Sequence, residues 1–306
     1  MTGDFRAVEV IAPATTANLG PGFDCLGLAL NLHNRVRMWP GGDAPLSINV
    51  EGSHDSVPLD SSNLVYRAAA RIFELAGRRP EQLTIEIQLG APLARGLGSS
   101  ASAIVCGMAA ANALLGDPLP KSQLLSEMVA MEGHPDNVVP CFTGGLVASL
   151  AVDERIEMIK TEPHASIRFV VLIPAYELST AKARAAIPKS IPIKDAVFNL
   201  ARVPFVLERL RSGVLEGLGD LMDDKLHQPY RKPLIKGYDA IATQAIESGA
   251  SAVCISGAGP TILAVSHKDR ATDVARGMQA AIQSVGAQGE AFVLEADLTG
   301  VVINAL

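Results

Sequence analysis

A glycine-rich segment, residues 92–102, has the composition of a phosphate-binding loop: Pro-Leu-Ala-Arg-Gly-Leu-Gly-Ser-Ser-Ala-Ser. Gly96 and Gly98 leave room for a ligand beside the backbone and allow dihedral angles that other residues resist. Ser99 and Ser100 open a long apolar run, so their hydroxyls can cap a helix, bind phosphate oxygens or hold a metal ion. A helix starting here would direct its free N–H groups and its dipole at the same point. The segment therefore predicts an anion site suited to phosphate.

Three other interpretations of this segment must be weighed. For a generic Gly-x-Gly, a tight turn with a serine cap is the better interpretation. The P-loop pattern requires Gly-Lys-Ser/Thr, and no lysine follows Gly98. The dinucleotide-binding pattern is matched by Gly96, Gly98 and Ala101, but residues 119–131 have a helical pattern where that motif needs a strand ending in an acidic residue. This last alternative is weak.

A second polar segment, residues 132–138 (Glu-Gly-His-Pro-Asp-Asn-Val), gathers titratable side chains where glycine and proline interrupt a helix. We expect a loop here, and such a density of titratable groups in a loop is typical of a functional site. His134 and Asp136 could ligate a metal ion, and a solvated turn is the alternative. On these residues alone the turn is favoured.

Two further segments carry polar groups suited to a small amino acid. Residues 12–24 follow a short strand and are rich in Gly, Pro, Asn and Thr, which predicts a loop containing Asn18 and Asp24. An aspartate suits an ammonium group, although both residues could equally stabilise a turn. Arg184 lies in a basic stretch that would ordinarily be a solvated face, yet arginine is also the natural partner of a planar carboxylate. Both alternatives remain open for each segment.

The string Pro-x-x-x-Gly-Leu-Gly-Ser-Ser-Ala, residues 92–101, resembles the ATP-phosphate loop of the GHMP small-molecule kinases. Residues 12–24 and 132–138 resemble motifs of the homoserine kinase branch of this family, and residues 256–260 resemble a third glycine motif that packs against the phosphate loop. The resemblance spans nearly the whole chain in five ordered motifs. It implies ATP and L-homoserine as substrates, Mg²⁺ as the metal ion, O-phospho-L-homoserine as product and a role in threonine biosynthesis.

The resemblance also implies roles for individual residues. Ser100 and Glu132 would hold Mg²⁺, a hard cation that prefers oxygen ligands. Asn137 would orient the attacking hydroxyl, and Arg184 would stabilise the transferred phosphoryl group, since a loose transition state needs positioning and charge more than a strong base. Asp136 as a general base is the opposing hypothesis. The residues expected to bind the amino-acid substrate are Asn18, Asp24, His134, Asn137, Arg184 and Arg231. The residues expected to bind ATP are Asn63, Pro92, Leu93, Ala94, Arg95, Gly96, Leu97, Gly98, Ser99, Ser100, Ala101 and Ser102.

Two residues also have a plain structural interpretation. Asn63 resembles an adenine-contacting asparagine of the family, but it also precedes an apolar-periodic helix that ends at Gly77, where it would serve as the cap. His227 is interpreted as a buried, hydrogen-bonded structural histidine.

The elements that must position these residues follow from apolar periodicity. Strands are expected at residues 7–11, 26–30, 33–38, 46–50, 83–89, 144–150, 155–160, 167–173, 252–256, 261–265 and 291–294. Helices are expected at residues 62–75, 99–115, 121–131, 197–210, 215–226, 235–247 and 269–285. Pro229 should end the helix at 215–226 and leave Arg231 in the following turn. A turn is expected at Asp153 and Glu154.

Composition limits the class of protein. The 306 residues, 48% hydrophobic and 19% charged, describe an ordinary globular protein with room for two domains. A net charge of −6 and the absence of a basic block argue against a nucleic-acid partner. No secretory signal or membrane-length apolar run is visible, and the four cysteines are widely spaced, so we expect a cytoplasmic protein with buried thiols.

The expected fold is α+β, the two-domain GHMP kinase fold. Residues 1–163 would form an ATP-binding domain of the ribosomal-S5-domain-2-like type, and residues 164–306 a ferredoxin-like domain, with the active site between them. A homodimer is common in the family. Another GHMP kinase, of the mevalonate or archaeal shikimate type, and a non-catalytic binding member of the family are the alternative functions.

Overall fold

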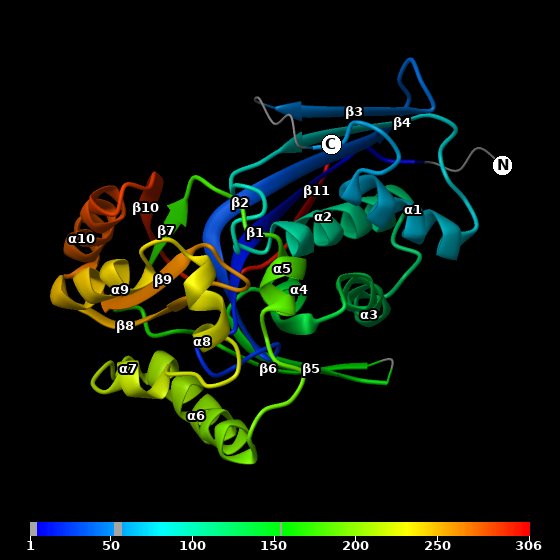
Figure 1. Ribbon diagram of the computed structural model, residues 1–306. Helices are drawn as coiled ribbons and strands as arrows, with labels where there is room; N and C mark the ends of the chain where they lie inside the picture. Colours follow the sequence, from blue (N-terminus) through cyan, green and yellow to red (C-terminus); the bar gives the residue numbers. More distant parts are fainter. Residues whose placement is uncertain (1–4, 52–56, 154) are drawn as a thin grey trace.

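The computed structural model describes residues 5–51, 57–153 and 155–306, and within these ranges the strands form a seven-stranded and a four-stranded sheet. We call the first sheet with α1–α4 the first lobe, and the second sheet with α5–α10 the second lobe (Figure 1). This agrees with the expected two-domain α+β architecture.

The first sheet has the order β11-β1-β2-β4-β3, with β5 paired to β2 and β6 paired to β5. All its pairs are antiparallel except β3 with β4. Its strands are β1 (Val8–Ala17), β2 (Leu26–Pro40), β3 (Leu46–Glu51), β4 (Leu83–Gln88), β5 (Leu146–Val152), β6 (Arg155–Thr161) and β11 (Val302–Ala305). The helices of this lobe are α1 (Leu64–Ala76), α2 (Ser99–Leu114), α3 (Lys121–Glu132) and α4 (Pro135–Thr143).

Helix α2 is the centre of the first lobe. It contacts α1, α3 and α4 as well as β1 and β2, and most of its residues are buried. This is why its sequence is apolar on every side instead of amphipathic. The phosphate-loop segment is therefore attached to the most deeply packed helix of the lobe.

The second sheet is antiparallel with the order β10-β7-β9-β8. Along β7 (Ile167–Pro174), Phe169 and Val171 face a core shared with the first lobe, whereas Val170 and Leu172 face α9 and α10. Burial on both faces explains the continuous apolar run of this strand. Its other strands are β8 (Ala250–Ile255), β9 (Ile262–His267) and β10 (Gly289–Leu294).

The second lobe has two long helices and several short ones. Its helices are α5 (Thr180–Ala185), α6 (Ile193–Ser212), α7 (Leu218–Leu221), α8 (Gln228–Arg231), α9 (Tyr238–Glu247) and α10 (Ala271–Ser284), with a 3₁₀ turn η1 (Lys232–Leu234). No helix in the described part of the chain combines the length and the apolar character needed to cross a bilayer.

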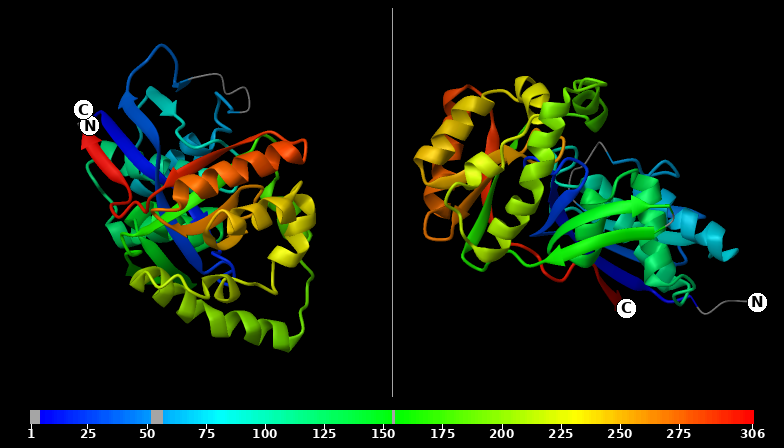
Figure 2. Two further views of the ribbon diagram at one scale, coloured as in Figure 1. Left: turned by 90° about the vertical axis from the view of Figure 1, so that its left-hand side faces the viewer. Right: turned by 90° about the horizontal axis from the view of Figure 1, so that it is seen from below.

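The chain passes between the two lobes twice. It enters the second lobe between β6 and β7, and after β10 it returns to the first sheet, where β11 pairs antiparallel with β1. The return is visible in both further views (Figure 2). The division between residues 163 and 164 stays a prediction. Strand β11 follows that division in the sequence but lies in the sheet of the first lobe.

Most of the expected elements are present, and several expectations are wrong. Residues 12–24 were expected to be a loop, but β1 extends to Ala17, with a register shift between Pro13 and Ala14 that accommodates the proline. Residues 132–138 were also expected to be a loop, but α4 begins at Pro135. Proline is well suited to the first turn of a helix, where its missing N–H has no intrahelical acceptor.

The third wrong expectation is the long helix at 215–226. Only α7 forms there, because the buried carboxylate of Asp224 accepts hydrogen bonds from the amides of Leu226, His227 and Gln228 and so holds a loop open. Pro229 lies inside α8 and does not end a helix, and Arg231 is the buried last residue of α8. The expected strands 26–30 and 33–38 are one continuous strand, β2. In the expected turn at 153–154, Glu154 lies outside the described residues.

Candidate functional site

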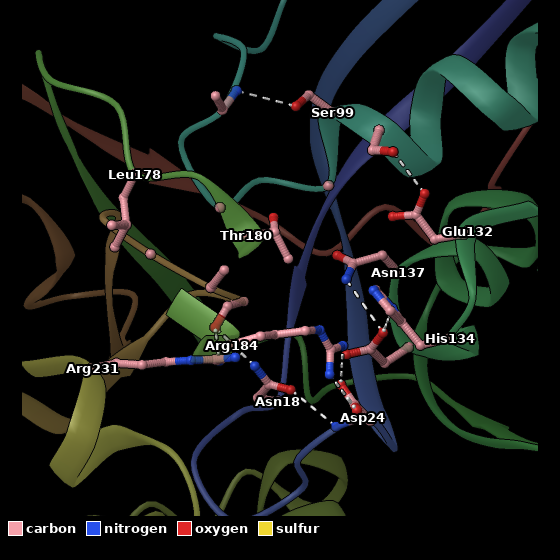
Figure 3. Close-up of a pocket in the computed structure, with 18 residues that line it drawn as sticks. Asn18, Asp24, Ser99, Glu132, His134, Asn137, Leu178, Thr180, Arg184 and Arg231 are labelled. Atoms are coloured by element: carbon pink, nitrogen blue, oxygen red, sulfur yellow. Dashed lines mark hydrogen bonds and ion pairs between the residues drawn. The ribbon is translucent and has the colours of Figure 1, made fainter. Parts of the chain in front are cut away.

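A pocket between the two lobes collects side chains from six segments of the chain (Figure 3). The first lobe contributes the β1–β2 loop, the glycine segment before α2 and the α3–α4 connection. The second lobe contributes α5, α8 and the β8–β9 loop.

The glycine segment exposes the amino end of α2 to this pocket. Gly98 is the N-cap of α2 with φ of +65°, and no side chain caps the helix. A Cβ at Gly98 would lie 1.9 Å from Thr15 Oγ1, so only glycine fits at this position. The first N–H groups of the helix and its positive dipole end are therefore open to a ligand. The serine cap of the tight-turn alternative is absent, and the Ser99 hydroxyl instead accepts a hydrogen bond from the amide of Ala94 at 3.3 Å.

The β8–β9 loop supports the glycine segment from the second lobe. Ser256 Oγ donates to the carbonyl of Gly96 at 2.6 Å, and the amide of Thr261 donates to the carbonyl of Arg95 at 3.1 Å. A Cβ at Gly96 would lie 2.4 Å from the Ser256 carbonyl oxygen. The contact that the third glycine motif was expected to make with the phosphate loop is thus present. Since α2 is followed by helix α3 and not by a strand, the dinucleotide-binding alternative fails.

Ser100 and Glu132 form a pair of oxygen ligands beside this helix end. Ser100 Oγ donates to Glu132 Oε2 at 2.7 Å. Burial raises the pKa of Glu132, and the Ser100 hydrogen bond and nearby His134 counteract this only in part. A half-buried carboxylate next to a hydroxyl and a helix amino end suits a hard divalent cation shared with phosphate oxygens. The residues present therefore fit Mg²⁺.

A chain of hydrogen bonds runs from β1 through α4 to the α3–α4 connection. Thr15 Oγ1 donates to Asn137 Oδ1 at 2.8 Å, and Asn137 Nδ2 donates to Asp136 Oδ1 at 3.4 Å. His134 Nδ1 lies 2.5 Å from the same Asp136 oxygen, and this hydrogen bond raises the pKa of His134. Because a carboxylate can only accept, the amide nitrogen of Asn137 is the atom that faces Asp136. Asn137 is next to the phosphate loop, since a Cβ at Gly98 would lie 3.0 Å from its Oδ1.

Two arginines of the second lobe face the same space. Arg184 makes a bidentate ion pair with Asp24, with nitrogen–oxygen distances of 2.8 and 3.0 Å. Arg231 is buried and donates to the carbonyl of Gly257 at 3.0 Å. The guanidinium carbons of both arginines lie 5.2–5.6 Å from the ring centre of Phe23. Asp24 balances one of these two charges.

Among the described residues, no carboxylate is hydrogen-bonded to Arg231, whose guanidinium pairs with His227 and with the carbonyls of Ala183 and Gly257. Burial, and then repulsion from Arg184, lower the pKa of Arg231 to about 10. An anion between the two guanidinium groups would relieve both effects, and a planar carboxylate matches their geometry. Beside them, Asn18 Nδ2 donates to the carbonyl of Gly257 at 2.8 Å and fixes the floor of the pocket.

Most of the predicted site residues meet in this pocket. Those that line it are Asn18, Asp24, Ala94, Gly96, Gly98, Ser99, Ser100, Glu132, His134, Asn137, Arg184 and Arg231. Those that do not line it are Asn63, Pro92, Leu93, Arg95, Leu97, Ala101 and Ser102. Asp24 joins His134 and Asp136 in a cluster whose ligand atoms lie within 4.8 Å of one another, so the metal-ligation alternative for His134 and Asp136 stays open.

Among the residues outside the pocket, Asn63 and Ser102 are occupied by structural hydrogen bonds. Asn63 is buried, and its Oδ1 accepts from the amides of Val65 and Tyr66, which is the helix-capping alternative. Ser102 Oγ accepts from Asn34 Nδ2 at 2.7 Å. His227 is buried and hydrogen-bonded to the Gly20 carbonyl at 2.9 Å, as interpreted from the sequence.

Sequence reasoning missed three residues of the site, one of which, Leu178, lines the pocket just before α5. Thr15 is buried on β1 and holds Asn137, and Thr180 lines the pocket at the start of α5. The signal for Thr15 was a pair of threonines inside an otherwise apolar strand. The signal for Thr180 was the Ser179-Thr180 pair, which is typical of a helix start; Ser179 Oγ accepts from the amide of Lys182.

Comparisons with known proteins agree on one family. The model of the GHMP kinases N terminal domain matches residues 63–145, and that of the GHMP kinases C terminal domain matches residues 206–283. A homoserine kinase from Synechococcus sp. (strain CC9605) is 47% identical over 299 residues, which cover 96% of this chain and 95% of the relative. A homoserine kinase from Crocosphaera subtropica is 42% identical over 97% of this chain and 98% of the relative. The crystal structure of homoserine kinase from Cytophaga hutchinsonii superposes with a TM-score of 0.88 at 29% identity, covering 99% of this chain and 98% of that chain.

Proposed function

The chain belongs to the homoserine kinases of the GHMP kinase family, which use ATP to phosphorylate the hydroxyl of L-homoserine, and we propose that the pocket between the two lobes is where it performs this reaction. The observation that carries the proposal is the meeting of four groups at one pocket: the open amino end of α2, the Ser100–Glu132 pair, the Asn137 amide and the two arginines. The product is O-phospho-L-homoserine, an intermediate of threonine biosynthesis.

ATP is bound by the glycine segment and the amino end of α2. Its phosphates accept hydrogen bonds from the free N–H groups that follow Gly98. The residues of this segment that line the pocket, Ala94, Gly96, Gly98, Ser99 and Ser100, contact the phosphates directly. Leu97 and Ala101 are buried and hold the segment in place. Asn63 caps α1, and we propose that it serves the adenine site by positioning this helix.

Ser100 and Glu132 would hold the divalent metal ion of the ATP complex, which we propose is Mg²⁺. An ion held there would supply positive charge that offsets the charge of the phosphates. Glu132 must be ionised for this role, and a bound cation would favour the ionised form against the burial that raises the pKa of Glu132.

L-Homoserine is recognised by charge at its amino-acid end. Its carboxylate lies between Arg184 and Arg231, where it relieves the repulsion of the two guanidinium groups. Its ammonium group pairs with Asp24, which releases Arg184 from its present ion pair. Asn18 and His134 complete this part of the site from either side. Asp24 and Arg184 thus exchange each other for the two charged ends of the substrate, and the net charge of the pocket does not change.

Asn137 orients the hydroxyl of homoserine toward the γ-phosphate. Its Oδ1 is held by Thr15 next to Gly98, so its Nδ2 can donate to the hydroxyl oxygen and leave a lone pair of that oxygen directed at phosphorus. Arg184 supplies positive charge near the transferred group. Asp136 is engaged by His134, and we assign it the role of orienting that imidazole instead of removing the proton.

Two further properties follow from the family and the chemistry. The enzyme is proposed to work in the cytoplasm, where ATP is available and where its four cysteines, none of them in a disulfide, stay reduced. Two copies of the chain are proposed to associate as a homodimer.

A coupled ADP-release assay with purified protein tests the function. We expect rapid ADP release with L-homoserine and Mg²⁺-ATP, and only background release without homoserine or with mevalonate or shikimate. The pocket is proposed to bind both charged groups of homoserine. γ-Hydroxybutyrate lacks the ammonium group and aminopropanol lacks the carboxylate, so each should have a kcat/KM lower by about a hundredfold or more. Equal turnover of mevalonate would contradict the substrate, and no turnover of any alcohol would favour a non-catalytic member of the family.

A further inference from the structure

Helix α6 carries a row of exposed apolar side chains on its outer face. Ile193, Val197, Leu200 and Phe205 are 83, 56, 72 and 58% exposed, and Ala201 and Pro204 between them are also exposed. The spacing of these six residues places them on one side of the helix. We call them the α6 stripe. Single exposed apolar residues are ordinary, but a continuous row along a helix indicates a contact surface.

The opposite side of α6 is already occupied. Val206 and Leu210 are buried in the core shared by the two lobes, and Asn199 donates to the Pro21 carbonyl at 3.0 Å and to Asp224 at 2.6 Å. The helix lies along the lower edge of the molecule, at its surface, in Figure 1. The α6 stripe therefore has no role in holding this chain together.

The α6 stripe is complementary to itself when one copy is turned end for end. Val197 and Phe205 lie four residues before and after Ala201, and Lys194 and Glu208 lie seven residues before and after it. Two antiparallel copies crossing at Ala201 would set Val197 against Phe205 twice and Lys194 against Glu208 twice. Both charged residues are exposed, and Glu208 also pairs with Arg211 of its own chain at 2.8 Å.

The size of the α6 stripe also suits a helix pair. From Lys194 to Glu208 an α-helix extends about 21 Å. At the centre, Ala201 allows the two backbones to approach closely, while Leu200 and Pro204 fill the space on either side. A twofold axis through Ala201 produces a closed pair in which Val197 meets Phe205 twice and Ala201 meets its own copy.

We propose that α6 is the surface by which two copies of this chain associate, antiparallel, about a twofold axis at Ala201. This inference deepens the proposed homodimer and is independent of the kinase activity. A protein that remains monomeric would overturn both proposals, whereas a dimer formed through another surface would overturn only this one.

Mass measurement in solution tests the surface. By light scattering after size exclusion, the wild-type protein should have twice the mass of one chain, and Leu200→Glu should have the mass of one chain with unchanged circular dichroism. Ile159→Glu is the matched control, because Ile159 on β6 is 67% exposed but lies outside α6. Dissociation by Ile159→Glu with survival of the dimer in Leu200→Glu would assign the contact to β6 instead.

Charge reversal tests the antiparallel register. Lys194→Glu and Glu208→Lys should each weaken self-association at least tenfold, because each places like charges together at both ends. An equimolar mixture of the two variants should associate again, since every pair in the mixed dimer joins opposite charges. A mixture that associates no better than its components would refute the register.

Cross-linking tests the axis. Cysteines at a position on the axis come close enough for a disulfide, which requires Cα atoms within about 7 Å. Ala201→Cys should therefore form a linked dimer on mild oxidation. Phe205→Cys should not, because its copies would lie about 12 Å apart along the helices. Efficient linking of Phe205→Cys but not Ala201→Cys would also overturn the proposal.

Discussion

Glu132 is at the same time a half-buried carboxylate and the proposed metal ligand. Burial raises its pKa above the ordinary value, so its ionised form lowers the stability of the folded protein. We predict that Glu132→Gln abolishes Mg²⁺-dependent turnover yet raises the Tm of the ligand-free protein at neutral pH, on the order of 2 °C. Since protonation relieves the same cost, stability from this group is present at low pH and is lost as pH rises through its folded pKa.

The difference in Tm between wild type and Glu132→Gln should therefore close as the pH is lowered. Thermal unfolding followed by calorimetry at several pH values, without metal or nucleotide, measures it. A Glu132→Gln protein that is less stable than wild type at neutral pH would contradict the explanation, as would one that keeps its activity.

Thr15 is the residue-scale test of the Asn137 assignment. Removing its hydroxyl leaves the buried Oδ1 of Asn137 without its 2.8 Å donor, which costs about 1–3 kcal/mol and frees the amide to rotate. We predict that Thr15→Val lowers kcat about tenfold with little change in the KM for ATP, and that Thr15→Ser restores it. Steady-state kinetics on the purified variants measure both.

Thr84→Val is the control for Thr15→Val. Thr84 is also buried in the first sheet, and its hydroxyl donates to the Gly41 carbonyl at 2.7 Å, away from the pocket. It should lose similar stability and keep its kcat. Equal losses of kcat in both variants would mean that the Thr15 effect is a general loss of stability.

At this scale the sequence predicted residue types well and partners poorly. A glycine pair, a clustered Glu, His and Asn, and an arginine were assigned to a kinase site by the family resemblance, because their local patterns alone left a turn or a solvated face open. Asp24 was assigned to an ammonium group, whereas in this structure it is paired with Arg184, 160 residues away. Such pairings depend on how the lobes pack, which no local pattern records.

Among elements, the turn that begins α2 gives the clearest prediction. Gly98→Ala places a methyl group 1.9 Å from Thr15 Oγ1 and forces a non-glycine residue to a φ of +65°. We predict a fall in Tm and an increase of at least tenfold in the KM for ATP, because the open helix end is displaced. Thermal unfolding and ATP titration measure the two effects.

Gly116 beyond the other end of α2 provides the matched control. It has a φ of +79°, but a Cβ there would meet nothing within 4 Å. Gly116→Ala should cost about 1 kcal/mol of stability from backbone strain and leave the KM for ATP unchanged. An equal effect on ATP binding would show that the close approach at Gly98 is unimportant.

The elements themselves could be predicted where signals were strong and local. Asn63 and Gly77 mark both ends of α1, and the apolar composition of α2 marks a buried helix. Helix α4 was missed because Pro135 was interpreted as a helix breaker, although it begins the helix. The loop after α7 was missed because its cause, three backbone amides held by buried Asp224, is invisible in periodicity.

At the scale of the whole molecule, a ligand bound in the pocket contacts both lobes and should raise the free energy of unfolding of the protein. A ligand present at 100 times its Kd adds about 2.7 kcal/mol to the free energy of unfolding. We predict that a non-hydrolysable ATP analogue with Mg²⁺ raises the Tm, and that L-homoserine raises it further. Arg184→Ala should keep the first increment and lose most of the second, as measured by thermal shift.

Arg168→Ala is the control for this experiment, because Arg168 pairs with Glu295 at 2.7 Å outside the pocket. It should show both increments. Retention of the full homoserine increment by Arg184→Ala would remove Arg184 from the substrate site.

The overall topology could be predicted only in part. Strand periodicity and the family resemblance gave two lobes with a site between them, but not β11, whose four residues are exposed and carry no strong signal. Its pairing with β1 depends on a contact between residues nearly 300 positions apart. The lobes could be counted from the sequence, but the second crossing between them could not.

That second crossing limits how the enzyme can open. A lobe attached by one connection can swing and rotate freely, but the second lobe is attached by two, one before β7 and one after β10. Two connections at separate points exclude free rotation of the second lobe, so any opening of the pocket would be a rocking about the line that joins them. Substrates would then enter along one edge of the cleft, and each closure would bring Arg184 and Arg231 back to the same place opposite the phosphate loop.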